Sequence, residues 1–185
     1  SAQVAHAISQ VRDLDQLLSQ VTRLIGEAFG FLHVGIFIVD EANRYAVLHA
    51  TNSEGGQRML ARNHKLAVGH QGMVGYVTQT GLPRIALDAG ADAIHFSNPD
   101  LPNTRSEVAL PLRVGKEIIG ALDIQSTESK AFSQADVELF SILADQIGQA
   151  IKNARLFEEV YRSSQKLELT VQERTKQLTS ALENV

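Results

Sequence analysis

The sequence predicts an α+β fold in which helices cover both faces of a central sheet. Residues 105–125 read as a β-hairpin whose two faces are both mainly apolar, so both faces must be covered. Apolar residues recur with helical spacing in residues 14–28 and again from residue 137 onward. The chain has 185 residues, of which 44% are hydrophobic, and this supports one domain with extensions.

The hairpin is the centre of the predicted sheet. Gly115-Lys116 makes a two-residue loop, and Gly in its first position favours a type II′ turn. Counting back from this turn places Val108 opposite Asp123, so that the two side chains share one face. Pro111 lacks an N–H, and we therefore expect a bulge or an unpaired stretch at that residue.

The elements before the hairpin follow from apolar periodicity and turn residues. Asp13 is predicted to cap a helix that ends near Gly30, and residues 1–12 then form a separate linker helix. Residues 88–104 form a long irregular loop, which in a compact domain is usually a lid, a binding loop or disordered. The remaining elements are strands at 33–40 and 45–51, a short helix at 57–63, an edge strand at 66–68, a helix at 69–81 and a short strand at 84–87.

The clearest helix start lies just after the hairpin. Ser133 is the expected N-cap, Asp136 completes a capping box, and Phe132 packs on Val137 as a hydrophobic staple. No proline follows, so a helix from Ser133 to the end of the chain would be ~80 Å long. A small domain cannot cover such a length, and the far half is expected to find a partner helix.

The apolar stripe of this helix changes at residue 157. The part before it should face the domain, and the part after it follows the heptad rhythm of a parallel coiled-coil homodimer. Ser164, Arg174 and Ala181 weaken the pattern, so the alternative is a single helix that frays after Tyr161. The predicted dimer seam consists of Phe157, Val160, Ser164, Leu167, Val171, Arg174, Leu178, Ala181 and Val185.

Composition excludes several kinds of site and partner. The net charge is −4 without a block of like charges, which argues against nucleic acid and anionic membrane surfaces. The chain has no cysteine and therefore no disulfide, thiolate metal site or thiol nucleophile. No apolar run reaches the ~20 residues of a membrane span, and we expect a cytoplasmic protein. A start without Met and an end within the heptad pattern suggest a piece of a longer protein.

Several separated phrases resemble the GAF domains of bacterial multi-sensor histidine kinases and similar signalling proteins. They are VGHQGMVGYVTQTGLPRIALD, DAIHFSNPDLP, LPNTRSEVALPLRVGKEIIGALDIQS and ADQIGQAIKNARLFEEV. The resemblance implies a GAF-like (profilin/PAS-like) fold with an antiparallel sheet of about six strands. Terminal helices would pack on one face, while helix 73–76 and loop 88–104 would roof a pocket on the other. We assign the GAF domain to 13–156 and a coiled-coil signalling helix to 157–185.

The residues depart from GAF subfamilies with particular ligands. Bilin binders of the family use a Cys, or an Asp-Ile-Pro phrase with a nearby His, and its methionine sulfoxide reductases use cysteines. The Asn-Lys…Phe…Asp-Glu signature of its cyclic-nucleotide binders is also missing. Of six histidines, only His70 and His95 would lie near the pocket as haem ligands. Bilin, haem and cyclic nucleotide are therefore disfavoured, and the cofactor stays unassigned.

The predicted pocket combines apolar walls with a few polar groups, as small-molecule sites do. Several of these side chains also have a purely structural interpretation: Met73 and Tyr76 can fill the core, Arg105 can be an exposed charge or a partner of Glu107, and Asp123 can belong to a structural hydrogen-bond network. The candidates are Met73, Tyr76, Val77, Phe96, Leu101, Arg105, Ser106 and Asp123.

The resemblance favours a regulatory module that senses a small molecule and relays a conformational change to an output domain such as a histidine kinase. One alternative is a dimerisation and relay module without a ligand, and another is a stand-alone GAF-type enzyme. No HExxH, GxSxG or GxxxxGK[ST] pattern occurs, so we assign no catalytic or metal-binding residue and expect a non-catalytic chain.

Overall fold

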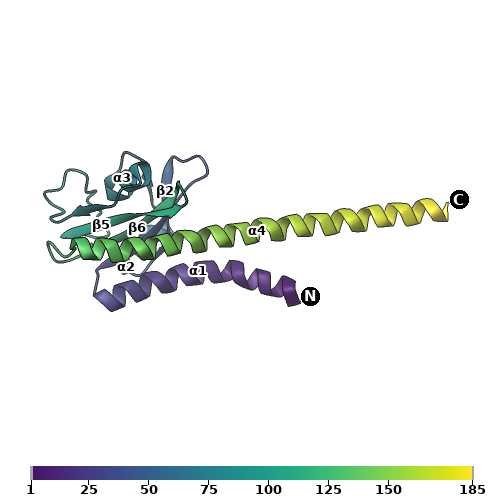
Figure 1. The fold of residues 1–185 in the computed structure, drawn as a ribbon, viewed down its shortest axis with the longest axis horizontal. Helices are drawn as coiled ribbons and strands as arrows, with labels where there is room; N and C mark the ends of the chain where they lie inside the picture. Colours follow the sequence, from purple (N-terminus) through teal and green to yellow (C-terminus); the bar gives the residue numbers. More distant parts are fainter. Residues whose placement is uncertain (1, 185) are drawn as a thin grey trace.

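The computed structural model describes the backbone of residues 2–184 and the side chains of residues 14–184. Six strands form one antiparallel sheet in the order β3-β2-β1-β6-β5-β4, which confirms the predicted α+β fold (Figure 1). The elements are α1 (Ala2–Phe29), β1 (His33–Val39), β2 (Tyr45–Thr51), α2 (Glu54–Ala61), β3 (Lys65–Ala67), α3 (Gly72–Thr80), β4 (Arg84–Ala86), β5 (Ser106–Val114), β6 (Glu117–Ser126) and α4 (Gln134–Glu183).

Helices cover both faces of the sheet. The antiparallel pair α1 and α4 lies along one face, and α3 lies across the other (Figure 1). We call these the helix-pair face and the pocket face. The core of the helix-pair face includes Val108, Leu122 and Phe140. The core of the pocket face includes Phe37, Met59 from α2 and Met73 from α3, so the sheet is buried on both sides.

The β5–β6 hairpin turns at Gly115 as predicted, with a positive φ of 62° that suits glycine. Beyond the turn the register differs from the prediction. Arg113 pairs with Ile118, but the preceding Leu112 pairs with Gly120. Ile119 is therefore an extra residue in β6, which is the definition of a β-bulge.

This bulge changes which residues share a face. Val108 lies opposite Ile124, and Asp123 lies opposite Ala109. The predicted pairing of Val108 with Asp123 is therefore wrong, because one extra residue moves the following side chains to the other face. The expected bulge at Pro111 is also wrong, since Pro111 lies within the regular register.

The start of α4 confirms the predicted cap. Ser133 Oγ accepts from the Asp136 N–H at 3.2 Å, and an Asp136 carboxylate oxygen accepts from the Ser133 N–H at 2.7 Å. Phe132 and Val137 are both buried in the core of the helix-pair face. Gly148 lets the helix approach β5, because a Cβ there would lie 2.6 Å from the Arg113 carbonyl oxygen.

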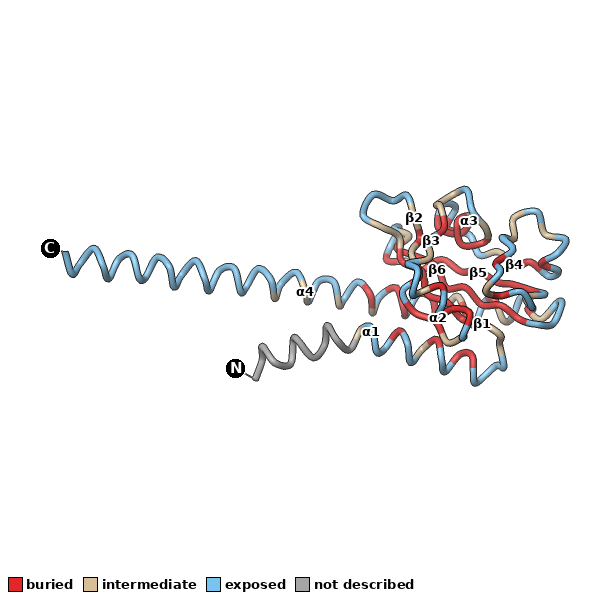
Figure 2. The backbone as a smooth tube through the Cα atoms, turned by 180° about the vertical axis from the view of Figure 1, so that it is seen from behind, coloured by how far each residue is buried: buried red, intermediate tan, exposed pale blue. Residues whose placement is uncertain are grey.

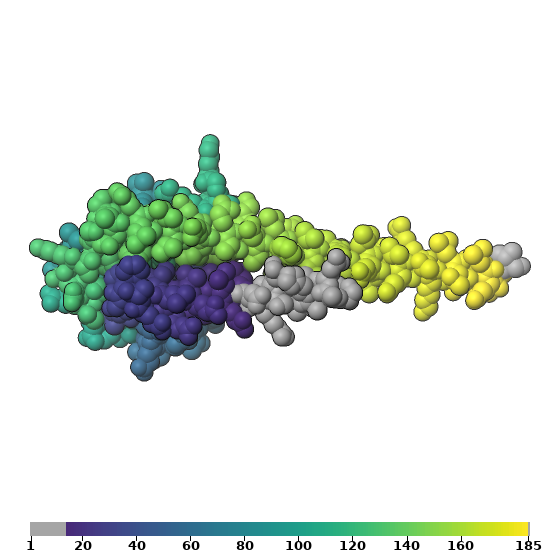
Figure 3. Space-filling model, turned by 60° about the horizontal axis from the view of Figure 1, so that its bottom comes forward, coloured from purple at the N-terminus to yellow at the C-terminus, as the bar shows by residue number. Residues whose placement is uncertain are grey.

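α4 continues for 50 residues without a break. Its buried residues end at Ile151, and the helix then projects from the domain with an exposed surface (Figures 2 and 3). Val160, Leu167 and Leu178 are each about two-thirds exposed, at 68%, 65% and 66%. The predicted dimer seam thus lies open along the single chain, and its last member, Val185, is outside the described residues. The dimer itself stays a prediction.

At the other end of the chain, α1 is one helix and not two. The predicted helix start at Asp13 is wrong, because the helix runs unbroken through that position; the side chain of Asp13 is outside the described residues. The proposed domain boundaries at residues 13 and 157 stay predictions.

The smaller elements lie close to their predicted places. α2 begins at Glu54, earlier than expected, because Ser53 caps it by accepting from the Gly56 N–H at 2.9 Å. The three-residue strands β3 and β4 form the two edges of the sheet, and residues 88–104 contain no helix or strand. Within residues 2–184, no helix is both long enough and apolar enough for a membrane span.

Candidate functional site

A small cavity of about 20 Å³ lies on the pocket face. The sheet forms its floor, and α2, α3 and the 88–104 loop enclose it. A cavity of this size can hold about one water molecule. Its lining mixes apolar side chains with three polar residues from the central strands, and it consists of Phe37, Met59, His64, Leu66, Gly72, Met73, Val74, Phe96, Asn98, Glu107, Asp123 and Gln125.

The central strands bring two acidic side chains to this cavity. Glu107 of β5 pairs with Gln125 of β6, and Asp123 lies two residues before Gln125 on the same face. Glu107 is 4% exposed and Asp123 is 2% exposed. The bulge at Ile119 is responsible, because without it Asp123 would point into the opposite core. Two carboxyl groups buried side by side are costly and need an explanation.

Neighbouring side chains supply some of the hydrogen bonds that the two carboxyl groups need. His95 Nδ1 lies 2.5 Å from Glu107 Oε2. Gln125 Nε2 donates to Asp123 Oδ2 at 2.7 Å, and Gln125 Oε1 accepts from Thr104 Oγ1 at 2.6 Å. Asp123 Oδ1 is buried and has no hydrogen-bond partner. The two carboxyl groups also share a hydrogen bond with each other, and no N–H or hydroxyl group of the described residues donates to Asp123 Oδ1.

The environment changes the acidity of both carboxyl groups. Burial raises the pKa of Glu107 to about 7. Burial, followed by the charge of neighbouring Glu107, raises the pKa of Asp123 well above its ordinary value. Like charges this close disfavour double ionisation, so the pair retains a proton near neutral pH.

A third buried group, His33 of β1, faces the acidic pair. His33 Nδ1 lies 2.7 Å from Ser53 Oγ and 3.3 Å from Thr51 Oγ1. The other ring nitrogen, Nε2, lies 3.9 Å from Asp123 Oδ2 and has no hydrogen-bond partner. Burial, followed by the charge of His64, lowers the pKa of His33 to about 4, so the ring is neutral.

The site thus has two buried side-chain atoms without a hydrogen-bond partner, Nε2 of His33 and Oδ1 of Asp123. Native proteins leave few buried polar atoms unpaired, and such atoms commonly mark a bound group. The Asp123 oxygen could accept from a positively charged group of a ligand, and the His33 nitrogen could contact a polar group beside it. Among the described residues, no cluster of three or more His, Asp and Glu side chains is suited to a metal ion.

The structure brings together only part of the predicted pocket. Met73, Phe96 and Asp123 line the cavity. Val77 and Leu101 are buried in the same core, and Tyr76 packs at its edge beneath the Arg84 guanidinium group, 5.2 Å from the ring centre.

The other two candidates lie elsewhere. Arg105 is exposed at the start of β5, and Ser106 donates to the Glu128 carbonyl oxygen at 2.5 Å. Ser106 precedes Glu107 in the strand, so it points to the opposite face. Of the two histidines considered as haem ligands, His95 contacts the acidic pair, while His70 is exposed.

Sequence reasoning missed several residues of the site. His33 was expected to lie away from the pocket, which is wrong because its ring lies 3.9 Å from Asp123. Gln125 was not considered, and Glu107 appeared only as a partner of Arg105. A signal for Glu107 was present, because it is the single charge in the apolar run SEVALPL. No comparable signal marked His33, which begins an apolar strand.

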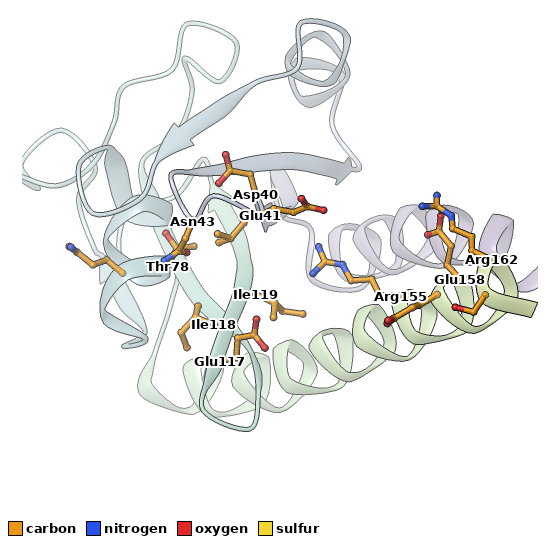
Figure 4. A pocket seen from close by; sticks show the side chains of 14 residues that line it. Asp40, Glu41, Asn43, Thr78, Glu117, Ile118, Ile119, Arg155, Glu158 and Arg162 are labelled. Carbon is orange, nitrogen blue, oxygen red and sulfur yellow. The ribbon is translucent and has the colours of Figure 1, made fainter. Parts of the chain in front are cut away.

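A second, larger concavity lies where α4 leaves the domain. This groove has a volume of about 1010 Å³ between the hairpin, the β1–β2 turn and α4. Figure 4 shows Asp40, Glu41 and Glu117 on the domain side and Arg155 on the helix. None of the described side chains that line this groove has a buried polar atom without a hydrogen-bond partner, in contrast to the small cavity. We therefore take the small cavity as the candidate site.

Comparison with known proteins supports the GAF-like fold that the sequence predicted. A GAF domain from a phosphoenolpyruvate-protein phosphotransferase of Coxiella burnetii matches with a TM-score of 0.70 and 24% identity, over 83% of this chain and 92% of that one. A formate hydrogenlyase transcriptional activator of Salmonella typhimurium is 33% identical over 58 residues. That segment is 31% of this chain and only 8% of the activator.

The same fold also occurs in an enzyme. Free methionine-R-sulfoxide reductase from Neisseria meningitidis, solved in complex with its substrate, matches with a TM-score of 0.66 and 22% identity, over 84% of this chain and 94% of that one. This finding corrects our expectation of a non-catalytic chain, because catalysis is compatible with this architecture. At such identities the likeness to solved structures establishes the fold alone.

The sequence also matches a family model directly. The model described as GAF domain covers residues 11–152, which is most of the chain and includes all six strands. The match extends from α1 to the last buried turn of α4. Together with the six-stranded sheet and its two helical layers, it shows that the chain belongs to the GAF domain family.

Proposed function

We propose that this GAF domain is a regulatory sensor that binds a small molecule with a positively charged group in the Glu107–Asp123 cavity. The observation that carries this proposal is the buried acidic pair with its unpaired acceptor. A cationic group would supply the missing partner and could replace the proton that the pair retains. Expansion of the cavity on binding is required, because about 20 Å³ cannot hold such a ligand.

The strands of the site also support the helix that would carry the signal. Glu107 points into the cavity, while its neighbour Val108 points into the core of the helix-pair face. α4 packs on β5, with Gly148 against the Arg113 carbonyl oxygen. A shift of β5 on ligand binding would therefore change the position of α4 directly.

α4 has both room to move and a surface for a partner. The groove of about 1010 Å³ beside its exit leaves space between the helix and the hairpin. On the other side, an open groove of about 640 Å³ between α1 and α4 is lined by apolar side chains that include Leu17, Leu156 and Phe157. We propose that a second copy covers this groove and the seam beyond it, and that the dimer relays the signal to an output domain such as a histidine kinase.

The ligand proposal is tested by thermal unfolding with a panel of small amines and free amino acids, including methionine sulfoxide. A ligand that binds the folded state alone raises Tm, by an amount that grows with its concentration. Asp123→Asn should remove the shift, and Glu117→Gln, an exposed acid on the same hairpin, should keep it. No shift with any compound would favour the alternative of a relay module without a ligand. Chemical analysis of each compound after incubation with the protein distinguishes binding alone from catalytic conversion.

The relay proposal is tested at the weak positions of the seam. Ser164→Leu with Arg174→Leu should tighten the dimer in sedimentation experiments and make the output of the parent protein less responsive. Lys166→Leu with Ser180→Leu adds the same side chains outside the seam and should do neither. A tighter dimer with a fully responsive output would rule out a register change as the signal.

A further inference from the structure

The 88–104 loop closes the candidate site. Phe96 and Asn98 of this loop line the cavity, and Leu101 is 5% exposed in the core beside it. Because the cavity holds no more than about one water molecule, any larger ligand requires part of its wall to move. We call residues 96–101 the lid. The following inference deepens the proposed function and rests on it.

One side chain fastens the lid to α2. Arg58 Nε donates to Asp100 Oδ1 at 3.1 Å, and Arg62 forms an ion pair with Asp100 Oδ2. The Asp100 side chain is 14% exposed, while the two arginine side chains are about half exposed. The hydrogen bond from Arg62 lowers the pKa of Asp100, followed by that from Arg58, so the carboxylate stays charged. Solvent reaches both arginines, so this contact can open.

The backbones of the lid and α2 fit closely. A Cβ on Gly55 would lie 2.1 Å from the Asp100 carbonyl oxygen, so only glycine permits this approach. Asn98 Nδ2 lies 3.4 Å from Met59 Sδ of α2. The lid therefore contacts α2 through Asn98 and Asp100, while Phe96 packs against Gly72 at the start of α3.

α2 is suited to move with the lid. It has eight residues, including Gly55 and Gly56, and glycine is a poor helix former. Its N-cap Ser53 contacts His33, the buried neighbour of Asp123. A group bound at His33 and Asp123 would therefore shift the N-cap of α2 through the contact between His33 and Ser53.

The other part of the loop is held differently. Arg84 of β4 donates to Asp92 at 3.2 Å, and Asp92 in turn accepts from the backbone N–H groups of Ile94 and His95. These contacts attach residues 92–95 to the edge of the sheet. The loop is thus divided into a segment fixed to the sheet and a lid fixed to α2.

We infer that Asp100, bound by Arg58 and Arg62, is the latch of a lid that opens together with α2 to admit the ligand. Release of this carboxylate frees residues 96–101 while the 92–95 segment stays on the sheet. Ligand exchange is then governed by an ion pair outside the cavity, and the acidic pair inside it serves for binding.

Hydrogen exchange of the whole chain tests the latch without any ligand. Asp100→Asn should raise exchange at Leu101, whose N–H donates to the Asn98 carbonyl, and at Gln57, whose N–H donates to the Ser53 carbonyl. We expect a rise of roughly tenfold at these amides, because Asp100→Asn removes the charge that holds the lid to Arg58 and Arg62. Amides of β5 and β6 should be unchanged. Glu54→Gln, which removes the other partner of Arg58, is the matched control and should have no effect on Leu101.

A second measurement uses the absence of cysteine from the chain. Leu101→Cys places one buried thiol at the end of the lid, and its labelling by a thiol reagent reports opening. The labelling rate should rise in the Asp100→Asn background and not in the Glu54→Gln background. Unchanged exchange and labelling, or a uniform rise that includes β5 and β6, would overturn the latch. A latch that opens as expected while the amine panel gives no Tm shift would instead overturn the proposed function.

Discussion

The two faces of the sheet are built on different principles, although the same strands supply both. The helix-pair face is an apolar core in which Phe140 contacts Phe29 and Phe31. The pocket face buries Glu107, Asp123 and His33 and leaves two of their polar atoms unpaired. Buried charge without full pairing lowers stability, and sites of function are where proteins retain it. The comparison indicates that one face stabilises the domain and the other holds its site.

The largest expected loss of stability comes from a substitution in the core of the helix-pair face. Phe140→Ala removes a ring that is fully buried between α4 and the sheet, with ring centres 5.2 Å from Phe29 and 5.7 Å from Phe31. The cavity left behind should lower the free energy of unfolding by about 3–5 kcal/mol in urea denaturation. Ile142→Ala, at a 59% exposed position of the same helix, should cost under about 1 kcal/mol. Equal losses in the two variants would contradict the assignment of this face as the core.

A smaller effect concerns the pocket face and depends on pH. The pKa of Glu107 rises from 4.5 to about 7 on folding, so its stabilising contribution is complete below pH 4.5 and is lost toward pH 7. The pKa of His33 falls from 6.5 to about 4, so its contribution is complete above pH 6.5 and is lost toward pH 4. The two dependences oppose each other in the natural chain.

Glu107→Gln should leave the pH dependence of stability that comes from His33 without the opposing one from Glu107. Between pH 4.5 and 7, the free energy of unfolding of this variant should increase relative to the natural chain by on the order of 3 kcal/mol. Urea denaturation at a series of pH values measures this difference, with Glu117→Gln as the exposed control on the same hairpin. Parallel pH profiles for Glu107→Gln and the natural chain would show that Glu107 does not carry a raised pKa.

The smallest effect sharpens the comparison at the start of α4. Ser133→Ala removes the side chain that accepts from the Asp136 N–H and should cost about 1 kcal/mol. The loss should appear as faster hydrogen exchange in the first turn of α4, with the pocket face unaffected. Ser163→Ala, in the exposed middle of the same helix, should be neutral within about 0.5 kcal/mol. A comparable loss in both variants would mean that the cap contributes nothing specific.

Much of the fold could be predicted because its signals are local. The capping box at Ser133, the glycine turn at Gly115 and the long proline-free helix all appear in the sequence itself, and the structure confirms them. The bulge at Ile119 has no such signal, since it depends on how β6 fits between its two neighbouring strands. The same limit applies to α1, which is one helix in place of the two that local caps suggested.

The site was less predictable than the fold for a related reason. Its residues come from separate strands, and their meeting depends on register. A one-residue error placed Asp123 on the face of Val108 and obscured its relation to Glu107. His33 and His95 reach the pair from β1 and from the 88–104 loop, and no spacing in the sequence connects them.

The unsupported part of α4 has a mechanical consequence. After Gly148 the helix contains neither glycine nor proline, the residues at which helices most often bend. From Ile151 to Glu183 it forms a straight lever ~48 Å long, so a rotation of ~5° at its base would displace the far end by ~4 Å. A motion too small to disturb the packing around Phe140 would thereby become a displacement equal to roughly two to three residues along a neighbouring helix, at ~1.5 Å per residue.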